Sequence, residues 1–387
     1  MKKYLLIGGI VLGITIVLGG ITAFIFIGKQ KAQNSQQDNG GDWKEKTENI
    51  SKKSSYLAKP VFTHKMFDLK NIEYITPLGE VNGGFVEVQT LNGIMVDIKP
   101  EAVKNSPIEV YAPVDMELFT YAHTATDDQP NGDWNLEFRI NENVNLTIHH
   151  LNNAGAKITD VVGNSTTYND SRGINVKEPI EFKAGDIIGT TKGTSLANNW
   201  NIYIYDKSVQ NQFVNQKRYE NGGYMGERFL NSACPFDYYA DQTVKDSFYS
   251  LLGASAPGQS KTCGSPSKDK KGTLSGLWHL KKEGFGAEYD GNYANPFSVY
   301  MKSDKNITIY EMGKKYFTIE ASNPTYKNPE EITTSHCYRL TDNWNPGKFT
   351  GYAYFRIDSD MEMSAVYSAS GSCPVEFPAG NAKKYYR

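Results

Sequence analysis

Residues 144–151 read VNLTIHHL, a run in which apolar and polar side chains alternate. Alternation over a few residues is typical of a β-strand with one buried face. The same pattern recurs in three neighbouring runs: Ile94, Val96 and Ile98; Ile108, Val110 and Ala112; and Ile202 and Ile204. Glycine, asparagine and proline separate the runs, as they do between strands. Residues 71–207 are therefore predicted to fold as a β-sandwich or barrel.

The two histidines of this run are neighbours, so their side chains are expected on opposite sides of the strand. His150 shares the parity of Val144, Leu146 and Ile148, which predicts a hydrogen-bonded histidine in the core. A functional His150 is the alternative. His149 points the other way and is expected at the surface.

Strand patterns return after Gly272, in runs such as LSGLWHL, FSVYM and GYAYFRI. The chain also contains 25 Tyr, 18 Phe and 5 Trp, and aromatic side chains are enriched in strands. Residues 267–387 are predicted to form a second small β-barrel or sandwich. The fold as a whole is predicted to be mainly β.

Residues 208–266 are predicted to connect the two β regions through one short helix. The run DQTVKDSFYSLL begins with the N-cap residue Asp241, ends at Leu252 and is followed by Gly253. The four cysteines of the chain contain no CxxC pair, which disfavours a zinc or thioredoxin-type motif. Of three connectivities we prefer the sequence-local one, Cys234–Cys263 and Cys337–Cys373, in which the first disulfide staples this connector.

No charged residue occurs in residues 4–28, and a helix of that length spans roughly 37 Å, enough to cross a membrane. A cleaved signal peptide is the alternative, but its apolar region would be only about 7–15 residues long. Residues 1–28 are therefore predicted to be an uncleaved transmembrane anchor. Gly9 and Gly13 form a GxxxG pair that could support a helix dimer, although glycine is common in such helices.

Residues 29–70 are rich in Gln, Asn, Ser and Lys, a composition that predicts a flexible polar stalk. The short N-terminus is expected in the cytoplasm and the large C-terminal part outside it, where disulfides form. The 41 basic and 43 acidic residues balance, and no basic block suggests nucleic-acid binding.

Four blocks between Leu91 and Asp206 occur in the order of a known enzyme family. They are NGIMVDIKPE, IEVYAPVDMELFTY, LTIHHLNNA and IEFKAGDIIGTTKGTSLANNWNIYIYD. Together they resemble the β-sheet core of the lysostaphin-type zinc endopeptidases, which carry a duplicated hybrid motif and cut peptide crosslinks in bacterial cell walls. The resemblance covers about a third of the chain.

The resemblance implies a metal held by His, Asp and His, but most of these ligands are missing. Alignment on Asp97 places Gly93 at the first ligand histidine, and Asn201 and Tyr203 at the final His-x-His pair. His150 matches a helper residue and not a ligand. Because a catalytic zinc site generally takes three protein ligands, we interpret these five residues as a degenerate groove with no metal, cofactor or catalytic residue.

Two other patterns suggest weaker sites. His123, Asp127 and Asp128 lie close in sequence and could bind a metal, although such loop groups are common. Gly276-Leu277-Trp278 is similar to the G-x-W triplet at the start of lipocalin-like barrels, which would imply an interior for a small apolar ligand. An ordinary buried tryptophan is the alternative.

These patterns favour a membrane-anchored extracytoplasmic protein that binds cell-wall glycopeptide or a partner protein at the cell surface without catalysis. The aromatic residues Trp134, Trp200, Tyr203 and Tyr205 could be exposed and stack on sugar or peptide, although aromatic residues in strands more often serve packing. The alternatives are an active zinc-dependent wall hydrolase with rearranged ligands and a carrier of small apolar ligands in the C-terminal barrel.

Overall fold

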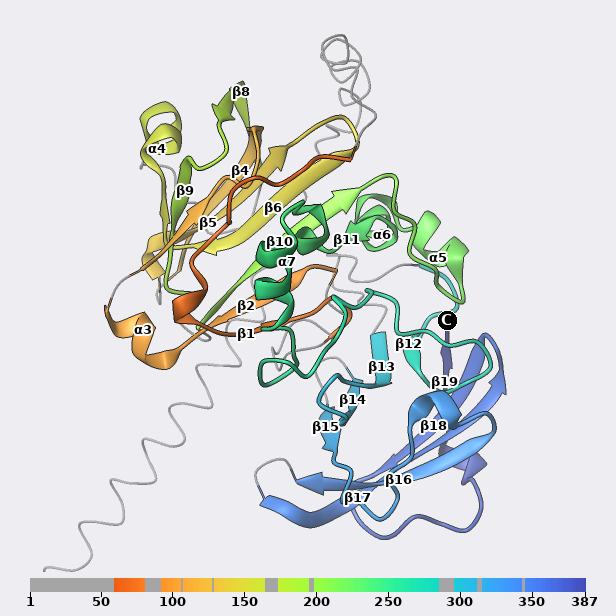
Figure 1. Cartoon of the computed structure of the whole chain (residues 1–387). Helices are drawn as coiled ribbons and strands as arrows, with labels where there is room; N and C mark the ends of the chain where they lie inside the picture. Colours follow the sequence, from red (N-terminus) through yellow and green to blue (C-terminus); the bar gives the residue numbers. More distant parts are fainter. Residues whose placement is uncertain are drawn as a thin grey trace, which may run out of the picture. The chain divides into compact units, whose positions relative to one another are not determined.

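The computed structural model describes residues 59–80, 92–105, 107–126, 129–163, 173–194, 198–284, 296–311, 315–342 and 345–387 (Figure 1). The predicted anchor, its Gly9 and Gly13 pair and most of the predicted stalk lie outside these residues. No helix in the described ranges has the length and apolar character needed to cross a membrane. The anchor therefore stays a prediction.

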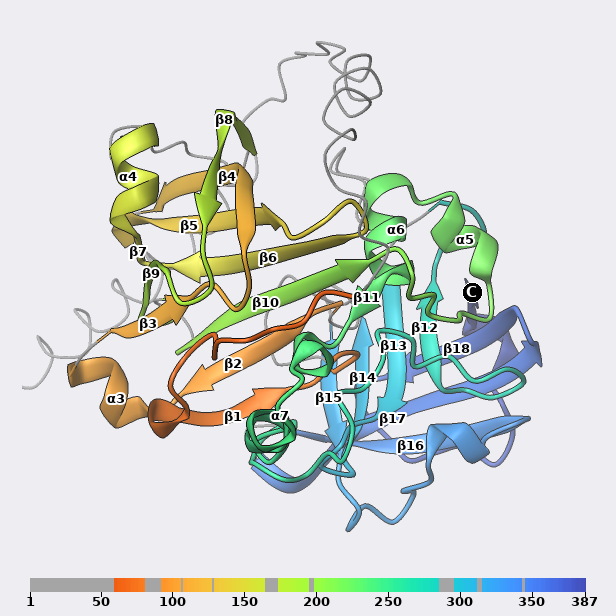
Figure 2. The ribbon, with the colours of Figure 1, turned by 45° about the horizontal axis from the view of Figure 1, so that its top comes forward.

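The first large sheet contains eight antiparallel strands. Figure 2 shows seven of them side by side, in the order β1 (Ile72–Thr76), β2 (Ile94–Ile98), β10 (Asn199–Asp206), β6 (Val144–Leu151), β5 (Gln129–Arg139), β4 (Met116–Thr126) and β8 (Ile174–Phe182). The eighth, β11 (Ser232–Ala233), pairs with β10. The alternating runs read from the sequence are thus strands, and β2, β10 and β6 are direct neighbours.

A three-stranded sheet shares the core of this large sheet. It consists of β3 (Ile108–Tyr111), β9 (Ile187–Thr191) and β7 (Asn153–Ala154). Val110 and Ile188 are fully buried in one apolar cluster with Val96, Ile148 and Ile202. The other short elements here are η3 (Leu69–Asn71), α3 (Pro100–Asn105) and α4 (Ala156–Val162). Their shared core covers one face of the large sheet.

The connector adds side chains to this same core. Its helical elements are α5 (Gln216–Glu220), α6 (Gly223–Leu230), η4 (Pro235–Tyr238) and α7 (Gln242–Tyr249). The side chain of Asp241 accepts hydrogen bonds from the first turn of α7, as the sequence predicts. Helix α7 ends three residues before the predicted Leu252. Phe236 and Phe248 stack with ring centroids 4.4 Å apart inside the first core.

The second large sheet is nearly closed and barrel-like. Its strands follow the chain as an antiparallel meander: β12 (Gly276–His279), β13 (Pro296–Met301), β14 (Ile307–Glu311), β15 (Lys315–Ile319), β16 (Ser335–Asp342), β17 (Asn345–Ser359), β18 (Glu362–Ser368) and β19 (Lys383–Tyr386). The first and last strands pair through His279 and Tyr386. At the remaining seam, Thr341 Oγ1 donates to the Thr318 carbonyl at 3.2 Å. Two short helices, η5 (Pro329–Glu331) and η6 (Ala379–Asn381), interrupt the meander.

The inside of this barrel-like sheet is packed with apolar side chains. Trp278 is fully buried, and the Arg387 guanidinium lies 4.0 Å from the centroid of its ring. Further buried side chains in the same cluster are Leu274, Phe297, Val299, Ile307, Ile309, Ile319, Ile332, Tyr338, Leu340, Ala353, Phe355, Met363, Ala365 and Tyr385. Because these side chains occupy the interior, they disfavour a small apolar ligand there.

Both predicted disulfides are confirmed. Cys234 pairs with Cys263 beside α7, and Cys337 pairs with Cys373 between β16 and the segment after β18. No free cysteine is found among the described residues. Each disulfide therefore stays within its own half of the chain, as the sequence-local pairing requires.

Candidate functional site

The large sheet has one polar face, centred on β10. Ile202 and Trp200 point into the core, so Asn199, Asn201 and Tyr203 lie on the opposite face by strand alternation. Asn201 is the cross-strand partner of Met95 in β2 and of His149 in β6. Asn199 is the partner of Asp97, and Tyr203 is the partner of Thr147. We define the polar face as Asp97, Thr147, His149, Asn199, Asn201 and Tyr203.

Gly93 and Tyr203 fit together directly on this face. A Cβ atom added at Gly93 would lie 2.3 Å from Cδ1 of Tyr203, far inside van der Waals contact. The Asn201 side-chain amide donates to the Tyr203 hydroxyl at 2.9 Å. The phenol ring thus occupies the space that any side chain at position 93, including a metal-binding histidine, would need.

His150 is not in the core as predicted, because β6 contains a bulge. Between the pairs Leu136–Ile148 and Trp134–Leu151, β6 has one more residue than β5. His150 is this extra residue, and its backbone φ is 68°. The fully buried Leu151 takes the inward position. His150 is instead half-buried.

A carboxylate orients the displaced His150 ring. Its Nδ1 lies 2.8 Å from Oδ2 of Asp133, and its backbone N–H donates to Asn135 Oδ1 at 3.2 Å. Its carbonyl accepts from Thr191 Oγ1 at 2.7 Å. The prediction that His150 is hydrogen-bonded is therefore correct, while its predicted place in the core is wrong.

Strand alternation after the inward-pointing Ile148 places His149 on the polar face, opposite Asn201 of β10. Its ring centroid lies 4.9 Å from that of Tyr203 and 6.0 Å from that of His150. Burial, followed by the neighbouring His150 and Arg228, lowers the pKa of His149 to about 3. His149 is half-buried rather than the surface residue expected from its parity. It is neutral at physiological pH, with one ring nitrogen donating and one accepting.

Asp97 lies at the β1 side of the polar face. Burial is the main reason that its pKa is raised to about 7, and the nearby Glu73 adds to the effect. The Asn199 side-chain amide donates to its Oδ1 at 3.3 Å and opposes the shift. No Lys or Arg in the described ranges forms an ion pair with Asp97.

Several polar atoms on and beside this face are buried without a hydrogen-bond partner in the described part of the chain. They are Asp97 Oδ2, Asn201 Oδ1, Thr147 Oγ1 and Asp133 Oδ1. Asn201 is only 6% exposed and Thr147 only 1%. Leaving a buried polar group unsatisfied costs about 1–3 kcal/mol, so such a cluster calls for an explanation.

An arginine from the connector borders the polar face, which sequence patterns did not reveal. The Arg228 guanidinium of α6 lies 4.1 Å from the ring centroid of Tyr224 and 4.6 Å from that of Tyr205. It also forms an ion pair with Glu137 of β5, which accepts from the Tyr224 hydroxyl at 3.0 Å. No signal in the connector sequence indicates that α6 reaches β5 and β10.

Most of the aromatic residues proposed for stacking are buried. Trp134, Trp200 and Tyr203 are at most 7% exposed, and Tyr205 is half-buried. The expectation that they form an exposed platform is wrong for the first three, because they pack within the sheet. Tyr224, at 59% exposed, is the accessible ring of this region.

The metal-site predictions concern residues only partly described. In the described ranges no three His, Cys, Asp or Glu side chains gather as metal ligands would. His123 is buried and stacks on Trp134 with ring centroids 3.8 Å apart. Asp127 and Asp128 lie outside the described residues. On the polar face, Asp97 and His149 alone do not match the three-ligand set that a catalytic zinc requires.

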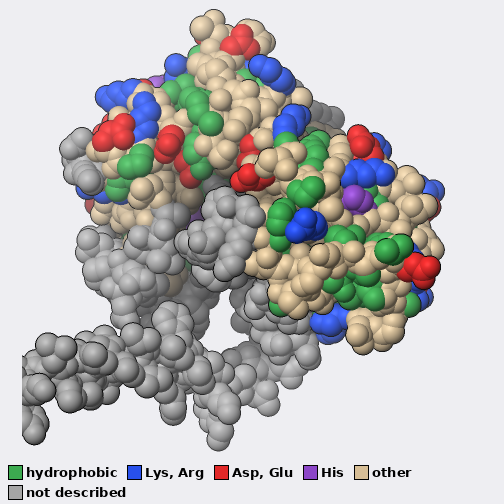
Figure 3. Space-filling view, turned by 90° about the horizontal axis from the view of Figure 1, so that it is seen from below, with side chains coloured by type: hydrophobic (Ala, Val, Ile, Leu, Met, Phe, Trp, Pro, Cys, Tyr) green, Lys and Arg blue, Asp and Glu red, His purple; other side chains and the backbone are tan. Residues whose placement is uncertain are grey.

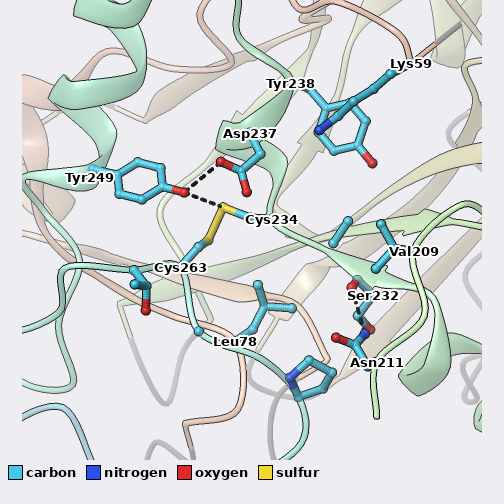
Figure 4. A pocket seen from close by; sticks show the side chains of 14 residues that line it. Lys59, Leu78, Val209, Asn211, Ser232, Cys234, Asp237, Tyr238, Tyr249 and Cys263 are labelled. Atoms are coloured by element: carbon cyan, nitrogen blue, oxygen red, sulfur yellow. Dashed lines mark hydrogen bonds between the residues drawn. A yellow bond between two sulfur atoms is a disulfide. The ribbon is translucent and has the colours of Figure 1, made fainter.

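An opening of about 280 Å³ lies beside the Cys234–Cys263 disulfide. Figure 4 shows Lys59 across the ring of Tyr238 on one side, and Tyr249 and Asp237 next to the disulfide on the other. The Lys59 ammonium is 4.3 Å from the ring centroid, and the Tyr249 hydroxyl donates to Asp237 at 2.8 Å. Because these polar groups already have partners, the opening is a weaker candidate than the polar face.

The charged side chains do not suggest another site. On the side visible in Figure 3, acidic and basic side chains are interspersed among the described residues. The net charge of the whole sequence is −2. This view gives no support to an extended basic surface on that side.

Comparison with known proteins adds no relative: no family model, curated protein or solved structure matches this chain. The resemblance to lysostaphin-type peptidases therefore stays a prediction.

Proposed function

We propose that this chain is a membrane-anchored extracytoplasmic protein that binds cell-wall glycopeptide through its polar face without cutting it. The observation that carries the proposal is the set of buried oxygens on and beside that face without a hydrogen-bond partner among the described residues, Asp97 Oδ2, Asn201 Oδ1, Thr147 Oγ1 and Asp133 Oδ1. A glycopeptide is rich in amide N–H and hydroxyl groups, which would donate to these oxygens.

The contact between Gly93 and Tyr203 supports binding over hydrolysis. The resemblance assigns metal-ligand positions to both residues, yet one has no side chain and the other fills the space with a phenol ring. Without three ligands a zinc ion is not held and the pKa of its water is not lowered. The uncharged run of residues 4–28 and the two disulfides support an extracytoplasmic address.

Two matched threonine variants test the proposal. Thr147 and Thr308 are both fully buried, and neither hydroxyl has a hydrogen-bond partner in the described ranges. Thr147 lies on the polar face, whereas Thr308 lies on β14 of the barrel-like sheet. The Val variant of each removes the same hydroxyl with little change in shape. We expect the full chain, purified in detergent, to co-sediment with insoluble peptidoglycan. Thr147→Val should weaken binding about fivefold, equivalent to one hydrogen bond of about 1 kcal/mol.

Thr308→Val should bind the wall like the unmodified chain. Equal binding by both variants would contradict a role for the polar face. Failure of the unmodified chain to sediment with the wall would contradict the function itself. Release of soluble wall fragments together with stoichiometric zinc in the purified protein would instead establish the hydrolase alternative.

A further inference from the structure

The opening beside the Cys234–Cys263 disulfide has a buried floor and an exposed rim. Leu78 and Ala233 line the floor and are at most 8% exposed. Lys59 and Thr262 line the rim and are exposed. The volume of about 280 Å³ exceeds the roughly 150 Å³ of an apolar cavity that holds one benzene molecule. The opening can therefore take a compact organic group.

Several polar side chains that line the opening already have partners within the protein. The Asn211 amide donates to three backbone carbonyls of the connector, at distances between 2.9 and 3.2 Å. The Ser232 hydroxyl donates to the Arg228 carbonyl, and the Tyr238 hydroxyl donates to Asp206. These groups therefore leave a ligand mainly the apolar surface of the floor.

The rim carries one cation without an acidic partner. The Lys59 ammonium lies 4.3 Å from the centroid of the Tyr238 ring, and Figure 4 shows it reaching toward the middle of the opening. No acidic side chain in the described part of the chain forms an ion pair with it. The carboxylate nearby, Asp237, pairs with the Lys245 ammonium at 2.6 Å and accepts from the Tyr249 hydroxyl at 2.8 Å. The charge left over at the rim is therefore positive.

We propose that this opening binds a small monocarboxylic acid as its anion. The carboxylate accepts a charge-assisted hydrogen bond from the Lys59 ammonium. The apolar body of the acid packs on Leu78, Ala233 and the disulfide, since ligand sites commonly combine apolar walls with a few polar groups. None of the residues that line the opening belongs to the polar face. The inference therefore goes beyond the proposed function.

Benzoate and benzamide are matched probes for this site, because they share a ring and differ in charge. Binding of each to the detergent-purified full chain is measured by saturation-transfer nuclear magnetic resonance, with detergent alone as the blank. We expect benzoate to bind saturably, with a dissociation constant on the order of 1 mM. Benzamide should bind at least about fivefold more weakly, because it lacks the charge that Lys59 recognises.

Three variants locate the binding. Lys59→Met keeps an apolar stem beside Tyr238 and removes the ammonium, so benzoate should bind this variant no better than benzamide does. Thr262→Trp fills the opening from the rim and should abolish binding of both probes. Lys70→Met removes an exposed ammonium that does not line the opening, so it should bind benzoate like the unmodified chain.

Circular dichroism and thermal melting establish that each variant is folded. Equal binding of benzoate and benzamide by the unmodified chain would overturn the inference, as would benzoate binding that survives Thr262→Trp. Absence of saturable benzoate binding would overturn it as well. Lys59→Met should still sediment with peptidoglycan, because its polar face is unchanged, so failure of this inference is distinguishable from failure of the proposed function.

Discussion

The Tyr203 ring fills the space beside Gly93, so any side chain at position 93 should lower the stability of the fold. Gly93→Ala should destabilise the fold by about 1–3 kcal/mol, because the added methyl group overlaps the ring. Denaturant unfolding measures this cost. Gly380→Ala is the matched control, since nothing lies within 4 Å of its added Cβ. Combining Gly93→Ala with Tyr203→Leu should recover part of the loss, whereas simple addition of the two costs would contradict the contact.

The raised pKa of Asp97 predicts that the stability of the fold depends on pH. Its pKa in the folded chain, about 7, lies above the usual 3.8, so the folded state binds the proton more tightly than the unfolded state. The contribution of the protonated carboxyl is present below about pH 4 and is lost as the pH rises toward 7. Asp97→Asn should therefore gain about 4 kcal/mol relative to the unmodified chain between pH 4 and 8.

Urea unfolding of both proteins across this pH range measures the difference. Asp115 is an exposed control, because Lys183 holds the pKa of that carboxyl below its usual value. Asp115→Asn should show no gain with rising pH. An Asp97→Asn curve parallel to that of the unmodified chain would contradict the assigned pKa.

The resemblance to a known family predicts part of the site. It groups Asp97, Asn201 and Tyr203, and strand register does bring them to one face. His150 was misplaced because strand parity assumes an unbroken period of two, and nothing in VNLTIHHL indicates a bulge. His149 lies on the face that parity assigns to it, but parity alone could not show that it is half-buried there.

Among the elements, the connector depends on its disulfide. Cys234 and Cys263 are 29 residues apart in sequence and close a loop around α7. Replacing both by Ser should cost about 3 kcal/mol, because the unfolded chain gains conformational freedom. Thermal unfolding of the variant and of the oxidised, unmodified chain, both without reductant, measures this loss. A double variant as stable as the oxidised chain would contradict the stapling role.

Local signals predicted α7 and the strands, but they did not predict α5 and α6. Asp241 provides an N-cap, and the alternating runs have a clear period, so short-range rules suffice there. Helix α5 is five residues long and is secured by a distant contact, from Asn215 Nδ2 to the Arg387 carbonyl at 2.7 Å. Such a partner, far away in sequence, leaves no local pattern.

At the scale of the whole molecule, Arg387 ties several segments together. The described residues belong to one compact unit, Ser55–Arg387. The Arg387 guanidinium donates to the carbonyls of Lys270, Thr273 and Ser275 and covers Trp278. Arg387→Met keeps the apolar stem and should cost about 2–4 kcal/mol, because buried carbonyls lose their donors.

Chemical denaturation of the full chain measures the cost of Arg387→Met. Lys384→Met, which removes an exposed cation from the same strand, is the control and should change stability by less than about 0.5 kcal/mol. Equal stability of the two variants would show that Arg387 does not secure the barrel-like sheet.

Composition and strand runs predicted a mainly β chain with a second β region, and that is the observed architecture. They left open whether this region is a barrel or a sandwich. The answer depends on the pairing of His279 with Tyr386, more than 100 residues apart, which no local signal encodes.

Binding of wall glycopeptide at the polar face, without cleavage, is most directly tested by nuclear magnetic resonance of threonine methyl groups. Soluble wall glycopeptides are titrated into the full chain in detergent, and the glycopeptides are recovered and weighed by mass spectrometry. The Thr147 methyl signal should shift with saturation, the Thr308 signal should stay in place, and the glycopeptide masses should be unchanged. An unmoved Thr147 signal at high glycopeptide concentration, or recovery of cleaved peptides, would contradict this account.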